Sequence, residues 1–171
     1  TDTQLVAGKR AWIHEEAAGR SWRVSARSFF QNRPAGIDAL VAEVQEMVDE
    51  YGVDGPLVDA YAGIGIFGAT IGANRPVFAI ERGSDSVADA RVNLVDVDAK
   101  IVKTDVARWH SSPAGVVIAD PAREGLGKGA VQTLVRAEAA VLVLVSCDPG
   151  SFGRDAKLLG NAGYELQRYT V

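Results

Sequence analysis

The chain has 171 residues, of which 47% are hydrophobic, so it is long enough for one domain with a sizeable core. Its formal net charge of −4 does not indicate a nucleic-acid-binding protein, and the lack of an apolar run of roughly 18 residues excludes a helical membrane span. Cys147 is the only cysteine and no signal peptide is present, which excludes an internal disulfide framework and predicts a reducing, cytoplasmic setting.

The N-terminal part of the chain differs from the rest in charge. Residues 1–33 carry six basic and three acidic side chains, whereas the remainder carries 12 basic and 19 acidic ones. Trp12, Trp22, Phe29 and Phe30 lie among these basic residues. Such a mixture can form a nucleic-acid surface or belong to a small sheet with solvated charges, and both interpretations stay open. Any RNA contact is expected around Arg20, Arg23 and Arg27.

The rest of the chain repeats a unit of strand, turn and helix. Loose alternation over residues 10–30 predicts a hairpin, and helical spacing of apolar residues predicts a helix from Ile37 to Tyr51. The further predicted strands cover residues 56–61, 77–80, 100–103, 116–119, 140–145 and 164 onward, and the further predicted helices cover residues 64–73, 84–94, 129–137 and 151–161. Strands that alternate with helices predict an α/β fold with a parallel sheet.

The turn after the first strand of this repeat carries three glycines. Gly63, Gly65 and Gly68 match the pattern G-x-G-x-x-G, in which glycine lets the backbone turn tightly and approach a ligand closely. Glu81 ends the next strand, where a carboxylate can accept hydrogen bonds from both hydroxyls of a ribose. The two features together predict a nucleoside cofactor, which could be a dinucleotide or S-adenosylmethionine.

Two later strands end in residues that can take part in chemistry. Asp120 follows the strand over residues 116–119, and Cys147 follows the strand over residues 140–145. Ligands of open α/β sheets bind outside the carboxyl ends of the strands, so a thiol here is placed to act as a nucleophile. Hydride transfer needs neither residue. Methylation of uracil C5 needs a thiolate, because addition of the thiolate at C6 makes C5 nucleophilic enough to attack a sulfonium methyl.

Four motifs together resemble the RNA uracil-5-methyltransferases, which make 5-methyluridine in tRNA and rRNA. The motifs are Ser28-Phe29-Phe30-Gln31-Asn32, the turn from Asp59 to Phe67, Asp120-Pro121-Ala122-Arg123-Glu124-Gly125, and Val145-Ser146-Cys147-Asp148-Pro149 followed by Arg154-Asp155. The resemblance implies a Rossmann-like fold for S-adenosylmethionine-dependent methyl transfer: a mostly parallel twisted sheet with helices on both faces, preceded by a short β segment. Residues 1–33 would be this β segment, part of a central domain, and residues 34–171 the cofactor-binding domain.

The resemblance also implies roles for individual residues. Cys147 would be the nucleophile, and Asp120 would lie between the cofactor and the target base. The implied cofactor-binding residues are Gln31, Tyr61, Gly63, Gly65, Ile66, Glu81, Asp105 and Asp120. The implied partner is RNA, either tRNA or rRNA, with S-adenosyl-L-methionine as the cofactor. No membrane partner is expected. No metal is expected either, because His14 and His110 lack metal-ligand spacing.

Parts of the family pattern are absent from the chain. Its N-terminal RNA-binding barrel has no match, and its catalytic glutamate, in a His-Val-Glu motif, would follow Val171. We therefore expect a piece of a longer protein that lacks the general base and the last strand of the sheet, and that is inactive alone. Two alternatives remain: an NAD-dependent oxidoreductase, in which Cys147 has no role, and a non-catalytic cofactor- or RNA-binding module.

Overall fold

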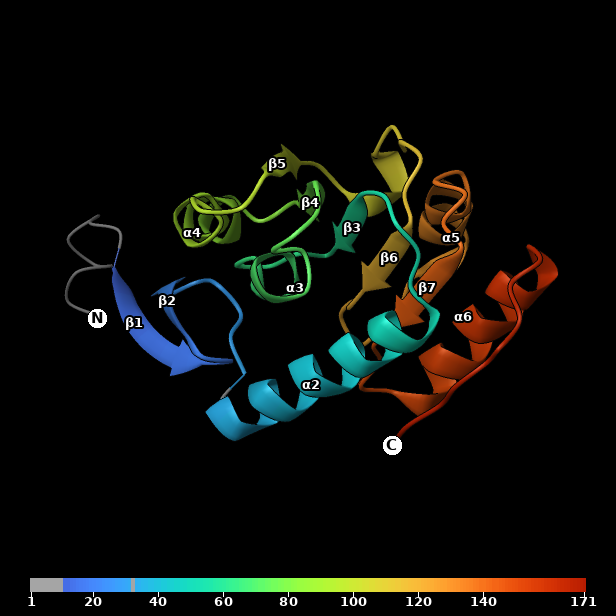
Figure 1. The fold of residues 1–171 in the computed structure, drawn as a ribbon, viewed down its shortest axis with the longest axis horizontal. Coiled ribbons are helices and arrows are strands. Elements are labelled where there is room, and N and C mark those ends of the chain that lie inside the picture. Colours follow the sequence, from blue (N-terminus) through green and yellow to red (C-terminus); the bar gives the residue numbers. More distant parts are fainter. Residues whose placement is uncertain (1–10, 32) are drawn as a thin grey trace.

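The computed structural model describes residues 11–31 and 33–171, which form two sheets with surrounding helices (Figure 1). The elements follow in the order β1 (Trp12–Ala17), β2 (Arg20–Ser25), α2 (Pro34–Tyr51), β3 (Leu57–Ala60), α3 (Ile66–Thr70), β4 (Val77–Glu81), α4 (Ser84–Asn93), β5 (Ala99–Lys103), the 3-10 helix η1 (Val106–Arg108), β6 (Val116–Ala119), α5 (Gly127–Val135), β7 (Val141–Leu144) and α6 (Pro149–Asn161). The predicted hairpin, the predicted first helix and the next five predicted strands are thereby confirmed.

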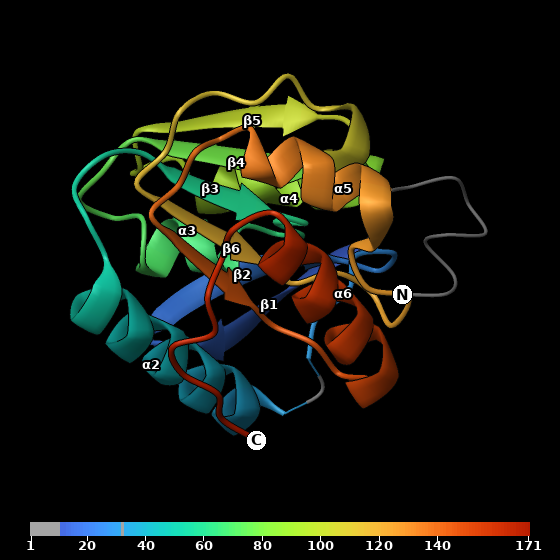
Figure 2. The same ribbon diagram turned by 90° about the vertical axis from the view of Figure 1, so that its right-hand side faces the viewer.

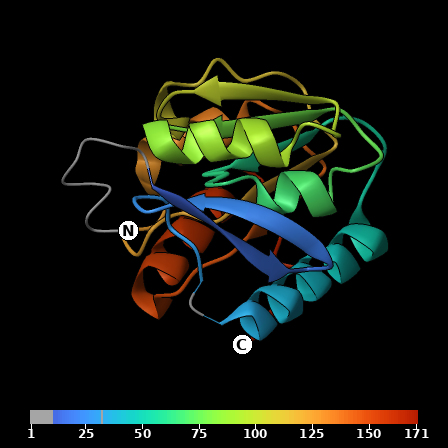
Figure 3. The same cartoon turned by 90° about the vertical axis from the view of Figure 1, so that its left-hand side faces the viewer.

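Five parallel strands form the central sheet in the order β5-β4-β3-β6-β7. All residues of β3 and β6 are buried, which explains why both strands are continuous apolar runs apart from Asp59. Neighbouring residues of β3, Leu57 and Val58, belong to separate hydrophobic cores on the two faces of the sheet. The hairpin, α2, α3 and α4 cover one face (Figure 3), and α5 and α6 cover the other (Figure 2). The predicted α/β class is confirmed.

The length of α3 and the presence of η1 differ from the prediction. Helix α3 has five residues, whereas the prediction covered residues 64–73. The backbone at Gly63 and Gly65 has φ of 55° and 94°, so the chain is still turning where the helix was expected to begin. The short helix η1 was not predicted. None of the described helices is both long enough and apolar enough to cross a bilayer.

The hairpin of β1 and β2 is attached to α4 by buried polar contacts. Trp22 is fully buried, and its indole N–H donates to the carbonyl oxygen of Ala17 at 2.8 Å. Asp89 of α4, also fully buried, accepts hydrogen bonds from the backbone N–H and the hydroxyl of Ser25, each at 2.7 Å. The amide of Asn93, also in α4, pairs with the backbone N–H and carbonyl of Arg23. Side chains of α4 therefore satisfy outward backbone groups of β2, where a further strand would otherwise pair.

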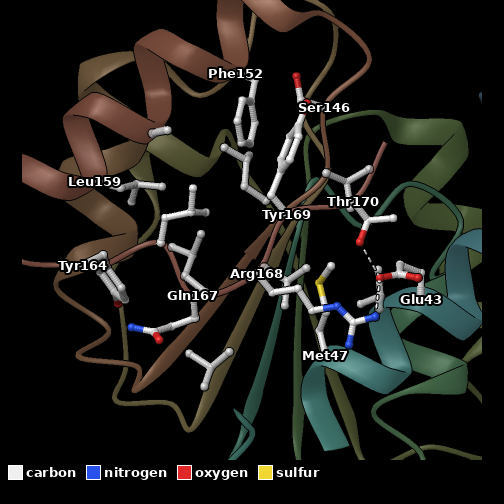
Figure 4. Close-up of a pocket in the computed structure, with 18 of the residues that line it drawn as sticks. Glu43, Met47, Ser146, Phe152, Leu159, Tyr164, Gln167, Arg168, Tyr169 and Thr170 are labelled. Carbon is white, nitrogen blue, oxygen red and sulfur yellow. Dashed lines mark hydrogen bonds and ion pairs between the residues drawn. The ribbon is translucent and has the colours of Figure 1, made fainter. Parts of the chain in front are cut away.

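Residues 164–171 form no strand, so the strand predicted from Tyr164 onward is wrong. The segment runs beside α2, to which it is held by Arg168 (Figure 4). The ion-pair partners of Arg168 are Glu43 at 2.9 Å, Glu46 at 3.0 Å and Glu50 at 3.0 Å. A strand needs a hydrogen-bonded neighbour, and within the described part of the chain this segment has none. Among these residues β7 is the edge of the sheet.

A cavity of about 690 Å³ lies between β7, α2, α6 and residues 164–171. Its walls are largely apolar, with Met47, Phe152 and Leu159 among the side chains that face it (Figure 4). Ser146 and Cys147 border one end. None of the residues predicted to bind the cofactor lines this cavity, so it is distinct from the predicted cofactor site.

Candidate active site

The register of the parallel sheet brings the predicted site residues to one edge. Ala60 of β3 pairs with Ile80 of β4 and with Ala119 of β6, so the residues that follow these strands are neighbours. Hydrogen bonds continue past the strand ends, from the N–H of Asp120 to the carbonyl of Ala60 at 3.3 Å and from the N–H of Val145 to the carbonyl of Ala119 at 2.9 Å. Loops far apart in sequence therefore meet at the carboxyl edge of the sheet.

The glycine turn and Glu81 form one unit at this edge. The backbone N–H of Gly63 donates to Oε2 of Glu81 at 3.0 Å, and the N–H of Gly83 donates to Oε1 of the same carboxylate. A side-chain carbon placed on Gly63 would meet no atom within 4 Å. The turn is thus open to a ligand at Gly63, and the carboxylate that ends β4 lies beside that opening.

A buried carboxyl group, Asp59, supports this turn from below. Asp59 is almost completely buried in β3, and its Oδ2 accepts a hydrogen bond from the N–H of Gly68 at 2.8 Å. Burial raises the pKa of Asp59 to about 7; the Gly68 N–H opposes this shift, and the negative charges of Asp120 and Glu81 add to it. Asp59 belongs to the motif from Asp59 to Phe67, and no function was predicted for it from the sequence.

Tyr61 lies within the electrostatic influence of Asp105. Tyr61 has a φ of 64°, which is uncommon for a residue other than glycine. Burial raises the pKa of Tyr61 to about 12, and the charges of Asp105 and Asp155 contribute to the rise. Asp105 caps η1 by accepting from the N–H of Ala107 at 2.9 Å, and one of its oxygens lies 3.7 Å from the guanidinium of Arg82.

Two predicted cofactor residues have weaker support. Ile66 begins α3 and packs against the core under the sheet, so a structural contribution accounts for its position. Gln31 is exposed, and no hydrogen bond among the described residues joins it to the other predicted site residues. Asn32, which follows it in the motif, is outside the described residues.

Asp120 and Cys147 follow neighbouring strands, β6 and β7. Burial raises the pKa of Asp120 to about 6, as expected of a largely buried carboxyl group that has no ion-pair partner among the described residues. Cys147 is a free, exposed thiol. It immediately precedes the Asp148 carboxylate that caps α6 by accepting from the N–H of Ser151 at 2.7 Å. The thiol is therefore accessible and is fixed beside the start of a capped helix.

Two of the three arginines predicted to contact RNA are engaged elsewhere. The guanidinium of Arg20 lies 2.7 Å from Oδ1 of Asp96, and Nε of Arg23 lies 3.1 Å from Oδ1 of Asp89. Arg23 also lies over the ring of Trp12. Arg27 is exposed, as is Phe29, at 75%. In the described residues no group of three or more His, Cys, Asp or Glu side chains could hold a metal ion.

The chain is similar in sequence to RNA methyltransferases, although no protein-family model matches it. It is 32% identical to an uncharacterized RNA methyltransferase of Streptomyces avermitilis, over 92% of its own length and 38% of that protein. It is 33% identical to one of Listeria innocua, over 92% of its own length and 36% of that protein. The chain thus spans well under half the length of these relatives.

Solved structures with the same fold include methyltransferases that act on RNA. The structure matches the Pyrococcus abyssi tRNA (uracil-54, C5)-methyltransferase in complex with S-adenosyl-L-homocysteine, with a TM-score of 0.76, 28% identity and coverage of 88% of this chain and 38% of that one. It also matches a T. thermophilus 16S rRNA N2 G1207 methyltransferase in complex with AdoMet and guanosine, with a TM-score of 0.63, 18% identity and coverage of 90% and 45%. These matches confirm the predicted Rossmann-like methyltransferase fold.

Proposed function

We propose that the chain is the cofactor-binding and nucleophile-bearing part of an enzyme that methylates C5 of uridine in RNA, tRNA or rRNA, with S-adenosyl-L-methionine. The observation that carries the proposal is the placement of Cys147 and Asp120 after neighbouring strands, at the same sheet edge as the glycine turn and Glu81. The likeness to a structure described as a tRNA (uracil-54, C5)-methyltransferase supports it. The single free thiol and the RNA substrate also favour a cytoplasmic location.

The residues at the sheet edge fit this cofactor. The backbone at Gly63 is open, and the adjacent Glu81 carboxylate can exchange its hydrogen bond from the Gly63 N–H for bonds from ribose hydroxyls. Asp105 follows β5, the strand beside β4, and its negative charge acts on Tyr61, which follows β3 on the other side of β4. Both residues can therefore border the adenosine part of the cofactor. Asp120 is a partly desolvated carboxyl group that would attract positive charge when ionised. When bound, S-adenosylmethionine supplies a methyl group on a cationic sulfur.

The protein's part in the chemistry is to activate the base. The Cys147 thiolate adds to C6 of uracil, and the C5–C6 double-bond electrons move so that C5 becomes nucleophilic. C5 then accepts the methyl group, whose bond to sulfur breaks and leaves a neutral thioether. A general base removes the C5 proton, the double bond re-forms, and the C6–S bond breaks to release the thiolate.

A trapped intermediate tests the proposal. In RNA that contains 5-fluorouridine, C5 carries fluorine in place of the proton, so the covalent adduct cannot resolve. We expect the complete natural polypeptide that carries this chain to form a protein–RNA band on denaturing gels, labelled by cofactor with a tritiated methyl group. Cys147→Ala should form no such band. If Cys147→Ala still converts uridine to 5-methyluridine, the proposed nucleophile and the C5 chemistry are both wrong.

Calorimetry on the 171-residue chain distinguishes the proposed methyltransferase from the two alternative functions. S-Adenosylmethionine or S-adenosylhomocysteine should bind, and NAD should not. Binding of NAD alone would favour an oxidoreductase. Cofactor binding by the chain, combined with no methyl transfer by the complete polypeptide, would favour a non-catalytic binding module.

A further inference from the structure

We propose that Asp155 is a positioning residue, which fixes the loop that carries Asp120 onto the helix that follows Cys147. The loop comprises residues 120–127, between β6 and α5. Neither of the two predicted catalytic residues contacts Asp155 through a described hydrogen bond, so Asp155 would act through the backbone of the loop. The inference rests on the proposed function in so far as it concerns catalysis.

The Asp155 carboxylate forms two hydrogen bonds to the loop. Oδ2 accepts from the N–H of Leu126 at 2.6 Å, and Oδ1 accepts from the N–H of Gly127 at 3.1 Å. The Asp155 side chain is 1% exposed, and among the described residues its only cationic neighbour at ion-pair distance is Arg154, at 3.5 Å. A carboxylate buried in this way is costly unless it is well hydrogen-bonded. The loop backbone therefore provides most of what stabilises the charge.

The loop is shaped around this carboxylate. Gly125 has a φ of 77°, and a side-chain carbon placed on it would collide with Oδ2 of Asp155. The same carbon would lie 3.0 Å from Cβ of Ser151 in the first turn of α6. Gly125 is thus required both by its backbone conformation and by the close approach of the loop to α6.

One further hydrogen bond and one charge effect link the loop to α6. The guanidinium of Arg154 donates to the carbonyl of Glu124. Asp148, the capping residue, has a lowered pKa, chiefly because of the hydrogen bond from the Ser151 N–H and to a smaller extent because of the positive charge of Arg123. The loop therefore contacts α6 at its first turn and one turn later, and the charge of Arg123 acts on the capping carboxylate.

Helix α6 links this anchor to the nucleophile. It begins at Pro149, two residues after Cys147, and Asp155 lies in its second turn. The thiol lies just before the start of this rigid helix, and the carboxylate that binds the Asp120 loop lies within it. The glycine turn depends on other contacts, those of Gly63 with Glu81. Loss of the Asp155 anchor should therefore disturb the geometry between Asp120 and Cys147 more than the cofactor site.

The test compares Asp155→Asn with Thr133→Val. Thr133 is equally buried and lies in α5, where its hydroxyl donates to the carbonyl of Ala107 at 3.1 Å and accepts from the guanidinium of Arg136 at 3.0 Å. Its variant therefore loses hydrogen bonds of a buried side chain away from the loop. Asp155→Asn should accelerate amide exchange at Leu126 and Gly127 at least about ten-fold. In the complete natural polypeptide it should lower kcat for methyl transfer about ten- to 100-fold, with cofactor Kd changed less than about two-fold. Thr133→Val should leave exchange at both amides and kcat unchanged.

Three results would overturn the inference: unchanged exchange at the two amides, an unchanged kcat in Asp155→Asn, or an equal loss of kcat in Thr133→Val. If Asp155→Asn does not fold, Gly125→Ala serves instead, because its added methyl group displaces the same carboxylate from the loop side. It should likewise lower kcat and leave the cofactor Kd almost unchanged. A wild-type protein that methylates no uridine would refute the proposed function. The amide exchange would still decide whether Asp155 anchors the loop.

Discussion

Asp59→Asn should make the stability of the chain less dependent on pH. The pKa of Asp59 is raised from 3.8 to about 7 by burial, so between these pH values the folded protein holds a proton that the unfolded chain releases. The free energy of unfolding therefore falls as pH rises through this range. Asparagine does not titrate, and its carbonyl oxygen can still accept the hydrogen bond from the Gly68 N–H.

The size of the effect follows from the shift in pKa. A pKa that is raised from 3.8 to about 7 corresponds to about 4 kcal/mol when the effect is fully developed, and the part that develops between about pH 5 and pH 8 is about 2.5 kcal/mol. Wild-type chain and Asp59→Asn would be unfolded with urea at several pH values across this range. The difference in unfolding free energy should shift in favour of the variant by this amount as pH rises.

Asp148 provides a control, because its effect on the pH dependence of stability has the opposite sign. The pKa of Asp148 is lowered, chiefly by the hydrogen bond from the Ser151 N–H, so its contribution to stability is present above the unfolded pKa and is lost as pH falls. Asp148→Asn should therefore differ from wild type most at neutral pH and least in acid. Parallel pH curves for wild type and Asp59→Asn would show that Asp59 ionises normally and would refute the argument from burial.

Three other outcomes are expected. Glu81→Ala should weaken S-adenosylmethionine binding by about 1.5–3 kcal/mol, the range for hydrogen bonds to a charged group; unchanged affinity by calorimetry would remove Glu81 from the site. Because the pKa of Asp120 is about 6, its charge appears as pH rises through 6, so affinity for the cationic cofactor should increase between about pH 5 and 7 and stay flat in Asp120→Asn. Residual RNA binding should be weak and salt-sensitive. Arg27→Ala should reduce the slope of log affinity against log salt by about one. Arg20→Ala removes an arginine that is already paired with Asp96, so it should leave this slope unchanged.

Much of the fold could be predicted because the strands are strongly patterned. β3, β6 and β7 are short apolar runs bounded by turn residues, and buried parallel strands have this composition. Strand register then determines that Tyr61, Glu81, Asp120 and the residues after β7 share one edge. The location of the candidate site thus depends on strand ends, which the sequence shows well.

The contacts that support the site were harder to predict. Asp59 and Asp155 are both nearly fully buried carboxyl groups, and the backbone N–H groups that they accept from lie 9 to 29 residues away. Carboxylates usually lie at the surface, so composition alone favours the opposite interpretation. The one available clue was the glycine pattern, because Gly68 and Gly125 lie where a side chain would crowd these two carboxyl groups.

The C-terminal segment shows the limit of strand prediction from pattern. Residues 164–171 have alternating character, but a strand is stabilised by a neighbour to which it can hydrogen-bond. In the described structure the segment is held by the ion pairs of Arg168 with α2, and a cavity of about 690 Å³ lies beside β7. The outer edge of β7 is consequently without a paired strand in the described residues, next to Cys147.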